Sequence, residues 1–441
     1  MIKLHLTLSG VAILLALLPS SCASKKAKTF DQKSDVAANS AEASPLRFAT
    51  KNMMASGLWG NPMMAWDPDI LREGKKVHFF FASLFCKRNN SWYFSWNPDD
   101  FKACSIENVS YSIGYAFKDE SVSDKFVFRP TPLIDLGNVG TWDDGQIETP
   151  EVIRRGSKYF MFYSAMPKNR TAPKEKSARY QIGVASIDLA EHNVRSLQDL
   201  LLNNTQIRFQ KNAANPILPH SNKIDRFDRE NTQEPTVIYR DGRFELFYTG
   251  IRADKKGTNQ PLDKDEALLD NAEYREIGLG RICLNDALTR QACALDDKPL
   301  LTMKFSSGGP EGSMVNMPNV YWYQNKYYLF YTRDGGKDDN HRGEKIYYRT
   351  SLDLINWTTE NLIIAGGQSS EDNWGVHSPG VAMIDTDHGA YFEMVYQSWG
   401  VGPRGEDNPY CIKKRFRVST NTDSKLCNST AVGFARQQVS E

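Results

Sequence analysis

The chain has 441 residues, enough to bury one large core or two ordinary ones. Lysine and arginine together number 54, against 53 aspartates and glutamates, so the formal net charge is +1. This near balance removes the electrostatic reason to expect a nucleic-acid partner. Aromatic residues make up 11% of the chain, a composition that suits β-strands and surfaces on which sugars stack.

The first 22 residues have the pattern of an export signal. Lys3 supplies the positive charge that precedes the apolar region of a signal peptide, and the apolar stretch 10–18 (GVAILLALL) is too short to span a membrane as a helix. The PSSC that follows resembles the lipobox of bacterial lipoproteins, which predicts that Cys22 is lipidated. A signal peptide cut nearby is the alternative. We therefore expect an exported protein of the bacterial cell envelope, lipid-anchored at the periplasmic or outer-membrane face, or otherwise secreted.

Residues 23–45 are polar and rich in Ala, Ser and Lys, which predicts a flexible tether. No later segment looks like a linker of this kind, so we expect one folded domain over residues 46–441. The lipid anchor is then the only predicted membrane contact, and we expect the protein to be a monomer.

Six cysteines remain besides Cys22, and in an exported chain they indicate disulfides whose pairing a sequence alone leaves open. They fall into three pairs that are close in sequence, so pairing of nearest neighbours is the simplest expectation. The pairs are Cys86 with Cys104, Cys283 with Cys293, and Cys411 with Cys427. No C-x-x-C spacing indicates zinc.

A proline motif recurs five times, with polar residues before the proline and an apolar run after it. The copies are WDPDIL (66–71), IETPEVI (147–153), QEPTVI (233–238), NMPNVY (316–321) and HSPGVA (377–382). Their prolines lie at 68, 150, 235, 318 and 379, which gives steps of 82, 85, 83 and 61 residues. Each motif is followed by a short turn and an aromatic run, which is a hairpin signal.

Further strands recur after each hairpin, as in YQIGVAS (180–186) and EKIYYRTS (344–351). The main helical candidate is the short stretch 188–202, so strand repeats without intervening helices exclude a parallel α/β barrel. Periods of this length suit four-stranded blades with long loops. The sequence therefore predicts an all-β fold, a five-bladed β-propeller of four-stranded antiparallel blades.

In a propeller the innermost strands line a central channel, so the residues before the five prolines meet at one mouth. Three of them are carboxyls, and we predict these as the catalytic residues: Asp67, Glu148 and Glu234. Cleavage of a glycosidic bond needs a protonated acid and an ionised carboxylate, and crowding of like charges raises at least one pKa. The predicted substrate-binding residues are Trp66, Gln233, Asn316 and His377, with Trp142 and Asp143 of the WDDG loop.

The Asp-Pro of WDPDI and the glutamates near later prolines resemble the five-bladed propeller glycosidases. These include the arabinanases and xylosidases of glycoside hydrolase family 43 and the related invertase and levanase enzymes. The segment YYRTSLDLINW (347–357) also resembles a blade-closing segment of these propellers, and the resemblance covers about residues 60–400. It implies a glycosidase in which Asp67 is base or nucleophile. Of Glu148 and Glu234, one is then the general acid and the other an auxiliary residue, and the resemblance leaves open which is which.

The same resemblance implies a histidine near a central calcium. His377 is therefore a candidate metal ligand and Ca²⁺ a candidate structural ion, whereas the reaction itself requires no cofactor. We expect an exported glycoside hydrolase that acts on an oligo- or polysaccharide.

Other readings stay open. A phosphorylase-type propeller would need an anion site near the channel, and a non-catalytic glycan-binding surface lipoprotein would have no need of paired carboxyls. Met317 and Ser378 take the place of an acid in two motifs. The propeller therefore does not require an acid at this position, which favours a catalytic role for the acids in the other motifs. Asp69 and Glu151, directly after two of the prolines, are back-up carboxyls, and Arg252 is a candidate contact for a charged sugar or a plain surface residue.

Overall fold

The structure is a computed structural model. It describes residues 49–52, 65–88, 91–93, 109–123, 125–168, 179–221, 223–255, 257–258, 260–261, 272–293, 298–304, 315–333, 344–365, 375–386, 389–401 and 428–438. The statements below refer to these residues.

The described strands form five antiparallel sheets, which we call blades 1 to 5. Blade 1 contains β2 (Ala65–Glu73), β3 (Lys76–Arg88), β5 (Val109–Asp119) and β6 (Val127–Phe128), with β4 (Ser91–Tyr93) paired to β3. Blade 2 contains β7 (Gln146–Arg155), β8 (Lys158–Met166), β9 (Gln181–Asp188) and β10 (Gln210–Lys211). Blade 3 contains β11 (Asn231–Arg240), β12 (Arg243–Lys255), β13 (Ala272–Leu284) and β14 (Arg290–Gln291), with β15 (Leu301–Lys304) paired to β13.

Blade 4 contains β16 (Val315–Tyr323), β17 (Lys326–Arg333), β18 (Lys345–Ser351) and β19 (Asn361–Ala365). Blade 5 contains β20 (Gly375–Thr386), β21 (Gly389–Val401), β22 (Asn428–Gln438) and β1 (Ala49–Asn52). The predicted all-β propeller of four-stranded antiparallel blades is confirmed, and each motif proline lies in the first strand of a different blade.

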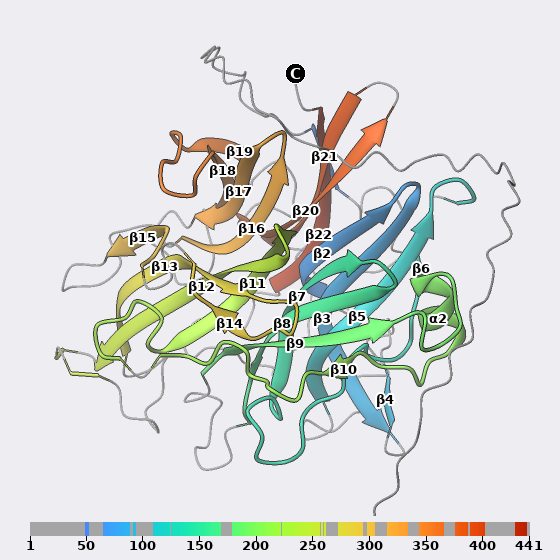
Figure 1. The fold of residues 1–441 in the computed structure, drawn as a ribbon, viewed down its shortest axis with the longest axis horizontal. Coiled ribbons are helices and arrows are strands. Elements are labelled where there is room, and N and C mark those ends of the chain that lie inside the picture. The colour runs from blue at the N-terminus through green and yellow to red at the C-terminus, as the bar shows by residue number, and fades with distance from the viewer. Residues whose placement is uncertain are drawn as a thin grey trace, which may run out of the picture. The chain divides into compact units, whose positions relative to one another are not determined.

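The first strands of the blades form a closed ring. Contacts run from β2 to β7, β7 to β11, β11 to β16, β16 to β20, and β20 back to β2. Figure 1 shows the closure, where blue β2 lies beside red-brown β20. The strand β1, which precedes blade 1 in the sequence, completes the last sheet, because it pairs with β22 as the outermost strand of blade 5.

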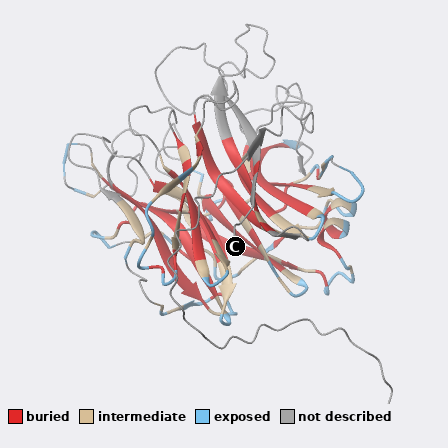
Figure 2. Ribbon diagram, turned by 90° about the horizontal axis from the view of Figure 1, so that it is seen from above, coloured by how far each residue is buried: buried red, intermediate tan, exposed pale blue. Residues whose placement is uncertain are grey.

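Burial follows the strands, and the exposed residues gather in the turns between them (Figure 2). The second strands supply most of the largest fully buried side chains, among them Phe79, Phe80, Phe81, Phe85, Tyr159, Phe162, Tyr163, Tyr248, Tyr327 and Tyr331. Blades 5 and 1 lie in close contact at Gly380. A Cβ atom added there would lie 2.5 Å from the carbonyl oxygen of Pro68, so this contact requires glycine.

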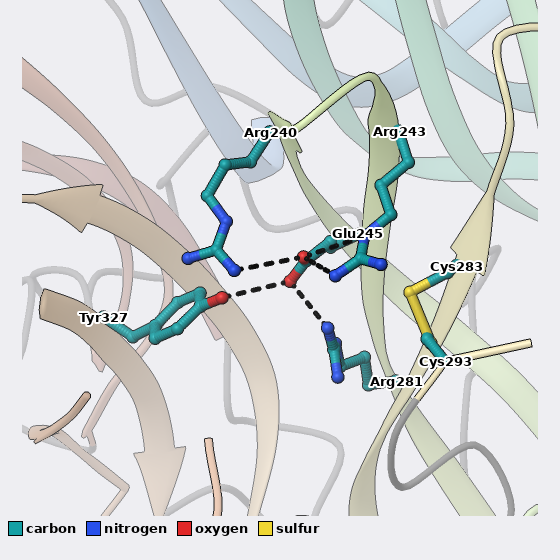
Figure 3. Close-up of a disulfide and its surroundings, with 7 residues drawn as sticks. All are labelled: Arg240, Arg243, Glu245, Arg281, Cys283, Cys293 and Tyr327. Carbon is teal, nitrogen blue, oxygen red and sulfur yellow. Dashed lines mark hydrogen bonds and ion pairs between the residues drawn. A yellow bond between two sulfur atoms is a disulfide. The ribbon is translucent and has the colours of Figure 1, made fainter. Parts of the chain in front are cut away.

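A buried carboxylate links blades 3 and 4 away from the motif prolines (Figure 3). Glu245 of β12 is fully buried and pairs with Arg281 at 2.9 Å and with Arg243 at 3.0 Å. The hydroxyl of Tyr327, from β17 of blade 4, donates to Glu245 Oε2 at 3.3 Å. Several donors therefore offset the burial of this charge.

Beside this cluster Cys283 and Cys293 form a disulfide (Figure 3), which confirms the predicted pairing of these two residues. Cys86 is also disulfide-bonded. Cys104, Cys411 and Cys427 lie outside the described residues, as do Cys22 and the segments predicted as signal (1–22) and tether (23–45).

The described helix is α2 (Leu197–Asn203), shorter than the stretch 188–202 that the sequence indicated. Its first turn is capped by Ser196, whose hydroxyl accepts the N–H of Asp199 at 3.3 Å. The preceding residues do not join the helix, because β9 continues to Asp188 and 189–193 form turns. Among the described residues no helix is long and apolar enough to cross a membrane.

We expect that removal of β1 destabilises the whole ring, because it leaves the edge of β22 without its partner. A chain that begins at residue 53 should unfold at a lower temperature than one that begins at residue 46, in calorimetry of both. Equal unfolding temperatures would show that the pairing of β1 with β22 contributes nothing to the stability of the fold.

Candidate active site

Each first strand contains a β-bulge at its motif proline. In blade 1, Trp66 pairs with Ala82 and Asp69 with Phe80, so two residues of β2 oppose one residue of β3. The same one-residue shift occurs at 148/151, 233/236, 316/319 and 377/380. Proline is tolerated at a bulge because the ladder is interrupted there and its missing N–H leaves no bond unmade. The bulge therefore explains a proline inside each first strand.

The residue directly before each of these prolines has a left-handed backbone. The φ angles are 46° at Asp67, 49° at Thr149, 58° at Glu234, 51° at Met317 and 50° at Ser378. Such a conformation costs a residue other than glycine on the order of 1–3 kcal/mol and persists only where the surroundings impose it. The fold imposes it five times.

Side chains of the preceding blade hold four of these residues through the backbone N–H. Met317 N–H donates to Glu234 of blade 3. The other three bonds go to second strands, from Glu234 N–H to Ser164 Oγ at 2.7 Å, from Ser378 N–H to Thr332 Oγ1 at 3.1 Å, and from Asp67 N–H to Gln397 Oε1 at 3.1 Å. The three acceptors occupy one repeat position, since each pairs with the residue two before its own blade's proline. The left-handed residues thus join consecutive blades.

The bulges bring the three predicted carboxyls together. Neighbouring residues of a regular strand face opposite sides, and a bulge breaks that alternation. Glu148 stands two residues before its proline, whereas Asp67 and Glu234 stand directly before theirs. Burial is the main cause that raises the pKa of Asp67, and the charges of Glu148, Glu234 and Glu344 raise it further. The hydroxyl of Ser378 donates to Asp67 Oδ1 at 2.9 Å and lowers that pKa in part.

Glu148 accepts a hydrogen bond from one neighbour of its own blade. The hydroxyl of Tyr180 donates to Glu148 Oε2 at 2.8 Å and itself accepts from the amide of Gln146. Burial raises the pKa of Glu148 to about 7, opposed by the Tyr180 hydrogen bond and assisted by the charge of Glu234. A carboxyl with this pKa both holds and releases a proton near neutral pH.

Glu234 has a different set of partners. The N–H of Met317 donates to Glu234 Oε2 at 2.8 Å, and the amide of Gln233 donates to Oε1 at 2.6 Å. Burial raises the pKa of Glu234, and these hydrogen bonds lower it in part. Because donated hydrogen bonds favour the ionised form, Glu234 is the carboxyl of the three that is best supported as an anion.

Two residues of this site, Tyr180 and Glu344, were not predicted. Each lies directly before the third strand of its blade, β9 or β18. They are equivalent by register, because Ser164 pairs with Ile182 and Thr332 with Ile346, two residues further on. The recurring third-strand segments YQIGVAS and EKIYYRTS contained this signal, since each begins with one of these residues.

The predicted substrate-binding residues Gln233, Asn316 and His377 stand two residues before their motif prolines, the position that Glu148 takes in blade 2. Gln233 contacts Glu234 directly, and His377 Nδ1 lies 3.6 Å from Glu344 Oε2. The Oδ1 atom of Asn316 is buried without a hydrogen-bond partner among the described residues. No cluster of metal-ligating side chains occurs in the described part of the chain, and the predicted Ca²⁺ at His377 stays a prediction.

The other predicted residues make contacts within the blades. The rings of Trp66 and Tyr111 pack edge to face with their centroids 5.0 Å apart, and Trp142 stacks on Tyr163 with ring centroids 5.9 Å apart. Asp143 Oδ2 forms an ion pair with Lys211 Nζ at 2.5 Å. Arg252 pairs with Glu276 at 3.5 Å in blade 3. These contacts account for the four residues structurally, and their roles in binding sugar stay predictions.

No family model and no curated protein matches the chain. Solved structures match over most of its length. One is a BT0996 complex with RGII, with 13% identity, 90% of this chain and 91% of the other covered, and a TM-score of 0.53. Another is a glycoside hydrolase, with 12% identity, coverage of 89% and 91%, and a TM-score of 0.50. The protein shares their fold.

A Cellvibrio cellulosa alpha-L-arabinanase complexed with arabinohexaose also matches, with 12% identity, coverage of 84% and 92%, and a TM-score of 0.45. At these identities the likeness is one of fold. The evidence for a catalytic function therefore comes from the three carboxyls of this chain.

We expect the stability of the protein to fall as pH rises from about 4 to about 7, because the buried carboxyls bind protons more tightly in the folded state. A folded pKa above the unfolded one contributes stability that is complete below the unfolded pKa and lost as pH rises through the folded pKa. Glu148→Gln should flatten this dependence in denaturant unfolding at a series of pH values. A variant curve parallel to that of the wild type would contradict the raised pKa of Glu148.

Proposed function

We propose that the protein is an exported glycoside hydrolase that cleaves an oligo- or polysaccharide, with Glu148 as general acid and Glu234 as its ionised partner. The observation that carries this proposal is the convergence of three carboxyls, Asp67 and Glu234 buried and Glu148 partly buried, with unequal hydrogen-bond support. Glycosidic cleavage needs one carboxyl that holds a proton and one that does not. Environments that push two pKa values apart supply that difference.

Glu148 suits the acid role because burial raises its pKa to about 7. The proton that it holds near neutral pH passes to the glycosidic oxygen as the bond to the leaving sugar breaks. Tyr180 orients the carboxyl through the bond to Oε2, which leaves Oε1 for the substrate. The Glu148 carboxyl is thereby both protonated near neutral pH and oriented toward the substrate.

Glu234 suits the ionised role because a backbone N–H and a side-chain amide donate to its two oxygens. As an anion it either attacks the anomeric carbon or removes a proton from the attacking water. The position of Glu234 is fixed by its own backbone as well, since its N–H is bound by Ser164 of blade 2.

Asp67 takes a supporting role in this proposal. The resemblance to known propeller glycosidases implied that it is base or nucleophile. Burial and the neighbouring carboxyls favour its protonated form, and Ser378 supplies its described side-chain donor. A protonated Asp67 can donate to a sugar hydroxyl and limit the negative charge around Glu148.

The surroundings favour hydrolysis over phosphorolysis. The charges that act on the pKa values of Asp67, Glu148 and Glu234 belong to carboxyls, which repel a phosphate ion. The complex with RGII, formed by a protein of the same fold, supports a glycan substrate. Lipidation of Cys22 and a position on the cell envelope complete the proposal, and His377 with a bound Ca²⁺ remains part of it.

The roles of the glutamates can be separated with aryl glycosides of different leaving groups. Glu148→Gln should lose about 10²–10⁴-fold in kcat/KM on substrates with poor leaving groups and much less on those with good ones, because only the former need a proton. Glu234→Gln should lose activity on both, and Asp67→Asn should lose less than either. Tyr327→Phe, at the Glu245 cluster away from the motif prolines, is the folded control.

A wild-type protein inactive on aryl glycosides and on a panel of plant and microbial polysaccharides would reject the glycosidase. Equal losses of Glu148→Gln on good and poor leaving groups would reject its role as the acid.

Tyr180→Phe removes the donor that lowers the pKa of Glu148. Because the acid must be protonated, activity falls as pH rises through its pKa, and a higher pKa moves that decline to higher pH. We therefore expect the alkaline limb of kcat/KM to shift upward in this variant. A downward shift would show that Tyr180 does not stabilise the ionised form of Glu148.

A further inference from the structure

A second polar level follows the carboxyls along the first strands. It consists of the residues one past each motif proline in blades 1 to 4: Asp69, Glu151, Thr236 and Asn319. Asp69, Thr236 and Asn319 are almost fully buried. Blade 5 has Gly380 at this position, where the backbone of blade 1 leaves no room for a side chain.

Three of these side chains bind the backbone of the next blade. Asp69 Oδ2 accepts the N–H of Val152 at 2.8 Å, and Thr236 Oγ1 accepts the N–H of Val320 at 3.1 Å. Glu151 in the same way accepts the N–H of Val237. The partner is each time the residue two past the next proline, so one bond is repeated between blades 1 and 2, 2 and 3, and 3 and 4.

These bonds connect the strands that carry the proposed catalytic residues. The bond of Asp69 joins the strand of Asp67 to that of Glu148, and the bond of Glu151 joins the strand of Glu148 to that of Glu234. Along a strand, two or three residues span roughly 7–10 Å. The separation of the three carboxyls is therefore fixed close to them, by Asp69 and Glu151.

A neutral acceptor is sufficient for such a bond, as Thr236 shows between blades 3 and 4. Blades 1 and 2 use carboxyls instead, and each of these two carboxyls changes the pKa of the other. Two ionised carboxylates have no hydrogen to donate, so a hydrogen bond between Asp69 and Glu151 requires one proton between them. Thr236 and Asn319 each donate to Glu151 at 3.3 Å.

We propose that Asp69 and Glu151 are positioning residues of the site, a pair that shares one proton and sets the spacing of Asp67, Glu148 and Glu234. This inference rests on the proposed glycosidase function. When the proton leaves, the two adjacent anions repel each other, and this repulsion displaces the strands of blades 1, 2 and 3 that they bind. The pair therefore ties the geometry of the site to pH.

The surroundings of the pair agree with a retained proton. Burial raises the pKa of Asp69 to about 7, and burial together with the charge of Asp69 raises the pKa of Glu151. Among the described residues, the groups that face the pair from neighbouring strands are the neutral side chains of Thr236 and Asn319 and backbone N–H groups. The charge that acts on Glu151 is that of Asp69.

The test compares Asp69→Asn with Asp69→Leu. Asparagine keeps an acceptor for Val152 N–H and offers its amide hydrogen to Glu151 in place of the shared proton, whereas leucine has similar size and neither group. We expect Asp69→Leu to lose on the order of 10²-fold in kcat with little change in KM, as for a misplacement of about 1 Å. Asp69→Asn should restore most of kcat at mildly acidic pH.

A second measurement, the pH dependence of the unfolding free energy, does not depend on catalytic activity. The unfolding free energy of the wild type should fall as pH rises through the titration of the pair, and Asp69→Asn should flatten that fall because its pair never becomes doubly charged. Tyr327→Phe is again the matched control. It removes a hydrogen bond between blades 3 and 4 at Glu245 (Figure 3) and should leave kcat and the pH dependence unchanged.

The positioning role is rejected if folded Asp69→Leu keeps wild-type kcat, if asparagine and leucine lose equally, or if the pH–stability curve of Asp69→Asn superposes on that of the wild type. These outcomes differ from failure of the proposed function. Absence of hydrolysis by the wild type would reject the glycosidase, whereas hydrolysis that tolerates Asp69→Leu would reject only the role of the pair.

Discussion

A left-handed residue stands before the proline of every first strand, and the preceding blade holds four of the five by the N–H. One such hydrogen bond contributes a net 0.5–1.5 kcal/mol or so, comparable with the cost of the conformation. The arrangement needs a preceding blade for every blade, and therefore a closed ring. Asp67 of blade 1 is held by Gln397, 330 residues further along the chain. Closure of the propeller and the local backbone of the site are thus a single constraint.

The same constraint creates the chemistry. A regular strand would turn adjacent residues to opposite faces, whereas the bulge lets acids at two different positions act on one another. Burial then raises the pKa of Asp67, Glu148 and Glu234, and the donors available to each decide how far. Glu148 has Tyr180, whereas Glu234 has a backbone N–H and an amide. The division of roles between the two glutamates follows from this difference.

The repeat of the motif prolines was sufficient to predict the sheets, because one proline per blade is visible as a spacing in the chain. The convergence of Asp67, Glu148 and Glu234 followed from equivalence of the blades. The bulge itself was not predicted, since a proline in a strand equally suits an edge strand or the first residue of a strand, and only the register between two strands decides. Tyr180 and Glu344 were missed because the segments between second and third strands differ in length, so no fixed step from the proline reaches them.

The stretch 188–202 has the composition of a helix, but the pairing of β9 with β8 takes its first residue, and turns take the next few. Tertiary pairing here prevails over local propensity. Asp143 shows a similar limit at the site, because an acidic loop residue beside a tryptophan is typical of a sugar contact. Its ion pair with Lys211 depends on a residue far along the chain.

The central claim is that a glycan binds where the three carboxyls meet, with its scissile bond between Glu148 and Glu234. A crystal structure of the Glu148→Gln variant with a glycan from the hydrolysis panel tests it most directly. We expect the glycosidic oxygen within about 2.6–3.2 Å of the residue 148 side chain, with the Glu234 carboxylate near the anomeric carbon. A glycan bound elsewhere, with the three carboxyls untouched, would contradict the claim.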